Sequence, residues 1–82
     1  MNLDLDKIDD DVLALLYLTS FREHPELPWH AWKGHEWDTL DRLFQKGLIG
    51  DPKGKTKSIV FSREGYKRAK ALFAAKYEKR AN

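Results

Sequence analysis

Apolar side chains recur at helical spacing in three stretches of the chain, and the first of these stretches is apolar nearly all round. It is the run VLALLYL, from Val12 to Leu18, within a predicted helix over residues 7–22. Asp6 can cap this helix, and the aspartates at positions 9–11 suit the positive end of the helix dipole. A helix that is apolar on more than one side predicts the centre of a small core, and a dimer or partner surface is the alternative.

A helix followed by a hairpin is predicted for the middle of the chain. Residues 36–46 carry an apolar stripe at helical spacing, formed by Trp37, Leu40, Leu43 and Phe44. Gly47 ends this helix, because glycine adopts the left-handed conformation without steric cost. β-Branched and aromatic residues occupy positions 48–49 and 58–61, and residues 50–57 between them have the composition of a turn. We therefore predict two paired antiparallel strands over residues 48–61.

The segment HPELPWHAWKG, residues 24–34, admits two interpretations. Pro25 and Pro28 bar a long helix. The segment is either a short helix that begins at Pro28 or an extended stretch in which residues 30–32 add a third strand to the hairpin, and we favour the extended form. We expect the three tryptophans to wall the core, with exposure at a binding site as the alternative. They are Trp29, Trp32 and Trp37.

A last helix is predicted to begin after Ser62, which can cap it. Its inward positions are Tyr66, Ala69, Leu72 and Phe73. We expect residues 77–82 to fray. The elements together predict one α+β, winged-helix-like domain over residues 1–82, with three main helices and a two- or three-stranded antiparallel wing hairpin.

The composition narrows the classes of protein to which the chain can belong. Its 82 residues suffice for one domain, and the lack of cysteine excludes disulfides, thiolate metal sites and cysteine nucleophiles. The acidic N-terminus lacks the basic region of a signal peptide, and we see no membrane span. We therefore expect a cytoplasmic protein.

Charge is distributed unevenly along the chain. The net charge is +2. Residues 1–41 hold 3 Lys+Arg and 10 Asp+Glu, a balance of −7, whereas residues 42–82 hold 12 and 3, a balance of +9. This division suggests an acidic end and a basic end, of which the basic end could meet phosphate or an acidic protein surface.

Two segments carry a family resemblance. They are LALLYLT in the first helix and AWKGHEWDTLDRLFQKGLIGDPKGKTKSIVFSREG in the middle of the chain. Over about residues 6–73 the chain resembles a family of small bacterial proteins of uncharacterised function, from whose pattern the HPELP segment and the lysine-rich C-terminal end depart. The resemblance implies a winged-helix-like fold and no assigned activity.

A second, more distant resemblance covers only the back half of the chain. The sequence KGLI, a following strand and SREG are similar to the end of the multiple-antibiotic-resistance-regulator type of DNA-binding domain. In that type, Lys-Gly-Leu-Ile ends the recognition helix and a Glu-Gly pair follows the wing. The similarity bears on the fold more than on the function, because one fold hosts many functions.

Basic residues on three predicted elements favour nucleic-acid binding, because Lys and Arg that neutralise phosphates supply most of the non-specific affinity. They are Arg42 and Lys46 on the second helix, Lys53, Lys55 and Lys57 on the wing loop, and Lys67 and Lys70 on the last helix. The front of the second helix opposes this interpretation. It carries Glu36, Asp38 and Asp41, which phosphates in a major groove would repel.

Two functions therefore remain open from the sequence. One is a protein that binds duplex DNA through the wing and the last helix, for which we expect a homodimer. The other is an interaction module that binds a protein partner through the Trp-rich surface or the acidic front of the second helix, or an acidic partner through the basic end. We expect no enzyme and no cofactor, because the three histidines lack metal-ligand spacing and no nucleophile has a base beside it.

Overall fold

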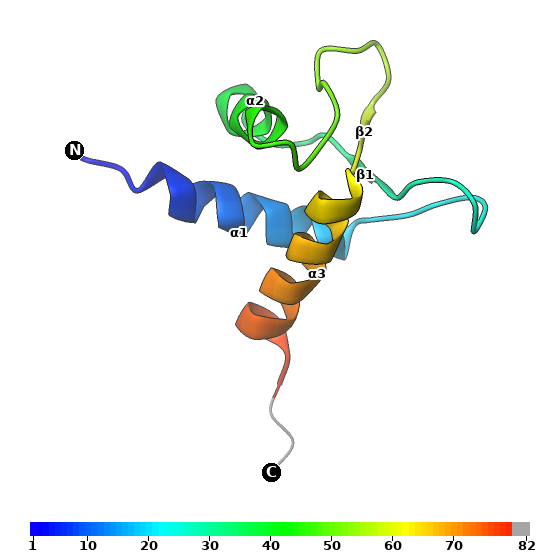
Figure 1. The fold of residues 1–82 in the computed structure, drawn as a ribbon. Coiled ribbons are helices and arrows are strands. Elements are labelled where there is room, and N and C mark those ends of the chain that lie inside the picture. Colours follow the sequence, from blue (N-terminus) through cyan, green and yellow to red (C-terminus); the bar gives the residue numbers. More distant parts are fainter. Residues whose placement is uncertain (80–82) are drawn as a thin grey trace.

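The computed structural model describes residues 1–79 and contains three helices and two strands (Figure 1). In chain order they are α1 (Leu5–Leu18), β1 (His30–Trp32), α2 (Trp37–Gln45), β2 (Ser58–Val60) and α3 (Arg63–Tyr77). The predicted α+β class is confirmed, and the order of elements is consistent with a winged-helix-like topology. The tail that we expected to fray begins at the last residue of α3, and its residues 80–82 lie outside the described part of the chain.

Helix α1 occupies the centre, as predicted, with α2, α3 and β1 all packed against it. Its buried apolar residues are Leu13, Ala14 and Leu16. The predicted bounds of this helix are wrong at both ends. Asp4, not Asp6, is the N-cap and accepts a hydrogen bond from the backbone N–H of Lys7 at 3.1 Å. The helix ends at Leu18, because Phe21 instead forms a bridge with His30.

The sheet joins two segments that lie far apart in sequence. Strands β1 and β2 pair antiparallel, with Ala31 opposite Ile59 and both side chains buried. The extended form that we favoured for residues 30–32 is therefore confirmed. The predicted pairing over residues 48–61 is wrong in extent, because it is reduced to the bridge between Ile49 and Phe61, flanked by hydrogen bonds from Gly50 N to Val60 O at 2.8 Å and from Ser62 N to Leu48 O at 3.0 Å.

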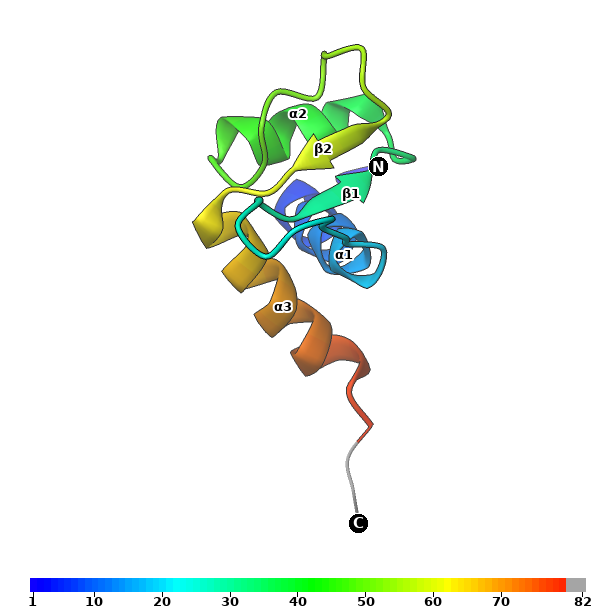
Figure 2. The same cartoon turned by 90° about the vertical axis from the view of Figure 1, so that its right-hand side faces the viewer.

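Residues 51–57, which we call the wing loop, explain why the hairpin is short (Figure 2). The carboxylate of Asp51 accepts a hydrogen bond from the N–H of Lys53 at 2.9 Å, which turns the chain immediately. Pro52 has no N–H to donate to a ladder, and its ring is buried. The return strand therefore finds its main partner in β1 rather than in residues 48–50.

Only one of the three tryptophans packs against the core. The ring of Trp29 is partly buried and stacks on Tyr66, with centroids 4.8 Å apart. By contrast, Trp32 is 56% exposed and Trp37 is 58% exposed, so the core prediction is wrong for these two and the alternative of exposure holds. Side chains alternate along a strand, and since Ala31 faces inward, Trp32 faces outward. Trp37 is the first residue of α2 and lies outside its buried set of Thr39, Leu40 and Leu43.

The end of α2 and the start of α3 meet at two glycines. Gly47 has φ +76°, which confirms the predicted left-handed stop. Ser62 caps α3 by accepting from Gly65 N at 2.9 Å, and its hydroxyl donates to Gly47 O at 2.7 Å. Gly65 lies directly on the backbone of Leu48, whose carbonyl oxygen would be 1.7 Å from an added Cβ. The crossing of these two segments therefore requires a residue without a side chain.

Candidate nucleic-acid interface

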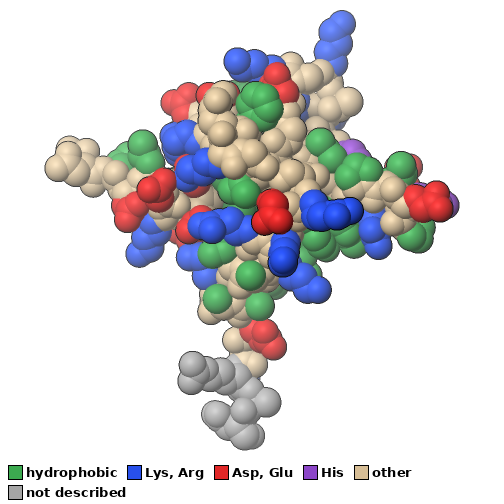
Figure 3. Space-filling model, in the orientation of Figure 1, with side chains coloured by type: hydrophobic (Ala, Val, Ile, Leu, Met, Phe, Trp, Pro, Cys, Tyr) green, Lys and Arg blue, Asp and Glu red, His purple; other side chains and the backbone are tan. Residues whose placement is uncertain are grey.

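The acidic residues of α1 lie against basic residues of α2 and α3. All the ion pairs found among residues 1–79 join these groups: Asp9 with Arg42, Asp6 and Asp9 with Lys46, Asp10 with Arg68, and Asp11 with Lys76. Figure 3 shows acidic and basic side chains next to one another on this face. The division of charge along the sequence therefore does not separate the folded molecule into an acidic and a basic end, because part of each half neutralises the other.

Asp9 is the centre of this arrangement. Its side chain is 1% exposed, and its two oxygens accept hydrogen bonds from Arg42 Nε and Lys46 Nζ, each at 2.8 Å. The Lys46 ammonium also binds the exposed carboxylate of Asp6 at 2.9 Å. These contacts raise the pKa of Lys46, and the hydrogen bond from Lys46 lowers the pKa of Asp6. Two of the seven basic residues predicted to meet phosphate thus hold α2 against α1.

Sequence reasoning missed the role of Asp9, although a signal was present. Asp9, Leu13 and Leu16 are spaced i, i+4 and i+7, so they lie on one face of a helix. A carboxylate in line with core leucines predicts a buried acid that needs a cationic partner. Asp38 and Arg42 stand four residues apart on α2, a spacing that favours an intrahelical ion pair, but Arg42 pairs with Asp9 instead.

The outer face of α2 keeps its negative charge. Glu36 and Asp38 are exposed and Asp41 is partly buried, while Arg42 is turned to Asp9. Within the described chain, only residues 33–36 connect β1 to α2, so α2 lacks the helix that immediately precedes the recognition helix in a helix-turn-helix. The front of this helix therefore presents carboxylates where a recognition helix would meet a DNA groove.

The wing loop presents the exposed lysines Lys53, Lys55 and Lys57, and none of the ion pairs within residues 1–79 involves them. The loop is held by Lys33, which precedes α2. Its ammonium donates hydrogen bonds to Pro52 O and Gly54 O, each at 2.7 Å. The three lysines therefore stand on a fixed loop rather than on a free one.

The two remaining predicted residues, Lys67 and Lys70, are exposed on α3. In both ribbon views, α3 extends away from the end of the molecule where the wing loop lies (Figures 1 and 2). The structure therefore brings together the three lysines of the wing loop but does not join the lysines of α3 to them in one patch.

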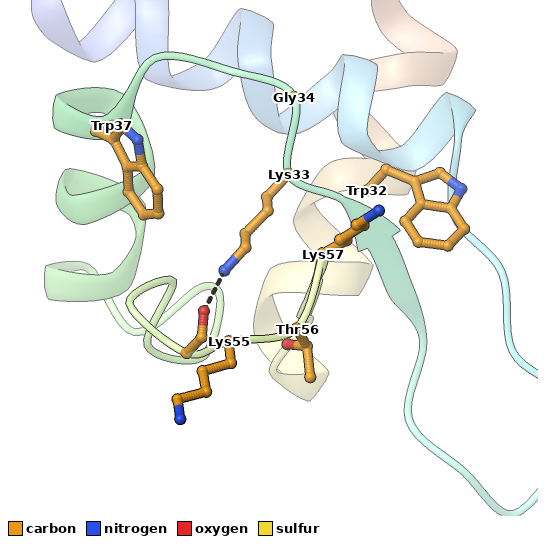
Figure 4. A pocket seen from close by; sticks show the side chains of 8 residues that line it. Trp32, Lys33, Gly34, Trp37, Lys55, Thr56 and Lys57 are labelled. Carbon is orange, nitrogen blue, oxygen red and sulfur yellow. Dashed lines mark hydrogen bonds between the residues drawn. The ribbon is translucent and has the colours of Figure 1, made fainter.

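A shallow cleft of about 560 Å³ lies beside the wing loop. We call it the tryptophan cleft. It is lined by Trp32, Lys33, Gly34, Trp37, Gly54, Lys55, Thr56 and Lys57. Figure 4 shows the two indole rings on opposite sides, with the side chain of Lys33 between them reaching toward the loop. The sequence offered the exposure of these tryptophans only as an alternative.

Other kinds of site find less support in the described residues. No three His, Asp or Glu side chains of residues 1–79 come together as a metal site would require. His30 stacks on Phe21 with centroids 5.9 Å apart, which gives that histidine a packing role. None of the helices in the described chain combines the length and apolar character needed to cross a membrane.

Comparison with known proteins identifies the family. The profile of a domain of unknown function, DUF6429, matches residues 4–79. The chain belongs to this family. It is 52% identical over 73 residues to the uncharacterized protein y4hR of Sinorhizobium fredii (strain NBRC 101917 / NGR234), an alignment that covers 89% of this chain and 92% of that protein. No solved structure matches the chain.

These comparisons agree with the resemblance to an uncharacterised family and add a bacterial homologue. The more distant similarity to multiple-antibiotic-resistance regulators receives no support from them and stays a prediction. Membership of the DUF6429 family assigns no activity.

We expect the protein to lose stability in alkali. Burial raises the pKa of Tyr66 from its ordinary value of 10.0, and the hydrogen bonds to Asp9 and Asp6 raise that of Lys46 from 10.5. A group with a raised pKa binds its proton more tightly in the folded state, so its stabilising effect is complete below the ordinary pKa and is lost as the pH rises through the folded value. The melting temperature should hold up to about pH 9.5 and fall above about pH 10.

Circular dichroism melts at increasing pH would measure this loss. The variant Tyr66→Phe lacks the tyrosine contribution and should lose less stability between neutral and alkaline pH than the unchanged chain. A melting temperature that stays constant well past the ordinary pKa of Lys46 would contradict the expectation.

Proposed function

We propose that the chain binds nucleic acid through the phosphate backbone, with the wing loop as the main contact. The observation that carries this proposal is the set of three exposed lysines on a loop that Lys33 holds in place. A loop that is already held in place loses little backbone conformational entropy on binding, and phosphate neutralisation needs no base-specific geometry. The lysines of α3 add a weaker, more distant contribution.

On this proposal, α2 does not read a groove. Its outer carboxylates oppose phosphate, and its two cations are paired with α1. Binding is therefore expected to depend little on base sequence, because phosphate contacts position a protein without specifying bases.

Fluorescence anisotropy with a labelled duplex of mixed sequence tests this proposal. Contacts from Lys53, Lys55 and Lys57 to three phosphates predict a slope of log affinity against log salt of about −2.7, which is a loss of about 40-fold between about 50 and 200 mM salt. Replacing the three lysines with glutamate should remove most of this slope and weaken binding at least about tenfold at low salt.

A matched pair of double variants distinguishes a specific contribution of the wing loop to affinity from an effect of net charge. Lys53→Glu with Lys55→Glu and Lys67→Glu with Lys70→Glu change the net charge equally, and all four side chains are exposed. We expect the wing pair to lose clearly more affinity than the α3 pair. Equal losses would assign the effect to net charge, and a lack of binding at low salt to both a duplex and a single strand would refute the proposal.

A protein-interaction module is the second candidate, and the outer face of α2 favours it. Glu36 and Asp38 are exposed there and form no ion pair within residues 1–79, so a basic protein surface would complement them. Co-purification from the native host with and without nuclease distinguishes the candidates, because a protein partner survives the nuclease. The homodimer expected from the sequence stays a prediction.

A further inference from the structure

The two rings of the tryptophan cleft are exposed but held in place. Trp32 packs against Phe21, with centroids 5.0 Å apart, and Trp37 lies beneath the ammonium of Lys33 at 5.4 Å. More than half of each tryptophan is nevertheless accessible. Exposed aromatic rings that neighbouring residues fix in position are suited to stack on a flat ligand, because little side-chain freedom is lost on binding.

The charge of the cleft selects an anionic ligand. Its lining includes Lys33, Lys55 and Lys57 and no Asp or Glu. Lys33 is occupied with the wing loop, whereas Lys55 and Lys57 form none of the ion pairs within residues 1–79. Hot spots for protein partners are poor in lysine, so the combination of lysine and tryptophan favours a chain that alternates phosphates with flat rings.

The accessibility of the bases favours single-stranded over duplex nucleic acid as the ligand. In a duplex the bases are stacked on one another inside the helix, and an indole ring on a shallow protein surface does not reach their faces. A single strand can turn its bases outward, and aromatic side chains beside a positive groove are the usual platform for such bases. The two rings lie on opposite sides of the cleft in Figure 4, and the exposed surface of each ring, except the face of Trp37 that Lys33 covers, offers such a platform.

We infer that the tryptophan cleft is a binding site for single-stranded nucleic acid, in which bases stack on Trp32 and Trp37 while Lys55 and Lys57 contact the phosphates. The inference rests on the proposed binding of phosphates by the wing loop and extends it, because it names the strand form and assigns a role to the two tryptophans. It predicts tighter binding to a single strand than to a duplex of equal length.

The test uses two probes that differ only in their bases: a short oligo-dT strand and an abasic strand of the same length. For oligo-dT, Trp32→Ala and Trp37→Ala should each weaken binding about 5- to 150-fold, the range found when one stacked base is lost. Trp32→Phe should retain much of the affinity, because a phenyl ring still stacks. Leu18→Ala, on an exposed apolar residue of α1, is the control and should bind unchanged.

The abasic strand separates this inference from the proposed function. It should bind the unchanged protein and both alanine variants equally, and it should quench tryptophan fluorescence less than oligo-dT does. If the abasic strand binds as tightly as oligo-dT, or if the alanine variants bind oligo-dT normally, stacking is refuted while phosphate binding by the wing loop stands. Equal binding of a poly-glutamate peptide and oligo-dT would also refute it. If neither the single strand nor the duplex binds at low salt, the proposed function is refuted, and the inference that rests on it is refuted as well.

Discussion

Replacing Gly65 with alanine is expected to lower the free energy of unfolding by about 3 kcal/mol, the upper part of the range for forced overpacking. An added Cβ would lie 1.7 Å from the carbonyl oxygen of Leu48 and 2.5 Å from its carbonyl carbon. Both are backbone atoms, and the same carbonyl accepts a hydrogen bond from Ser62 N at 3.0 Å. The clash therefore has to be relieved by moving α3 away from the end of α2. Chemical denaturation followed by circular dichroism measures the loss.

Two other glycines provide the controls for this substitution. Gly34 has open space around the position of a Cβ, so Gly34→Ala should leave stability unchanged or raise it slightly, because alanine restricts the unfolded chain. Gly47 also has open space but a φ of +76°, so Gly47→Ala should cost about 1 kcal/mol through the backbone alone. If Gly65→Ala lowers the free energy of unfolding no more than Gly47→Ala does, α3 does not approach Leu48 as closely as the structure shows.

Replacing Arg42 with methionine is expected to cost about 2–3 kcal/mol. Removing one partner of a buried ion pair typically costs about 3–5 kcal/mol, and the expected loss is smaller here because Lys46 remains beside Asp9 and the Arg42 side chain is 27% exposed. Methionine keeps an apolar stem of similar length, so the loss reports on the charge rather than on a cavity. Thermal and denaturant unfolding both measure it.

A triple variant is the decisive control for this ion-pair cluster. Asp9→Leu combined with Arg42→Met and Lys46→Met removes all three charges together and leaves no buried carboxylate uncompensated, since Asp6, which also loses Lys46, is exposed to water. It should be more stable than Arg42→Met alone, since replacing a whole buried cluster with apolar residues is often neutral. A triple variant that is less stable than the single one would show that the cluster contributes net stabilisation. Its affinity for DNA should match that of the unchanged protein if Arg42 and Lys46 serve the fold.

Local signals predicted much of the fold. The left-handed stop at Gly47, the cap at Ser62 and the extended form of residues 30–32 each depend on residues close in sequence, and all three are confirmed. The pairing of β2 with β1 was expected only as an addition to the hairpin, because the propensity of a strand does not name its partner. The turn formed by Asp51 and Pro52 shortened the hairpin more than composition indicated.

The candidate site was less predictable, for a physical reason. A count of charges along the sequence does not show which cations lie beside carboxylates in the fold, so Arg42 and Lys46 could not be distinguished from the lysines of the wing loop. The tryptophan cleft depends on the outward direction of Trp32 in β1 and on the start of α2 at Trp37. Neither can be read from composition, since tryptophan is common both in cores and at binding surfaces.

The ion pairs of α1 also bear on how the chain acquires its structure during synthesis. Asp9 and Asp10 find their cations 33 and 58 positions later in the chain, so the first helix emerges from the ribosome with its negative charges uncompensated. Contacts over such separations form only after the intervening chain has closed into loops. We therefore expect that the N-terminal half does not fold independently. The whole chain is expected to fold in a single cooperative step once α3 has been translated.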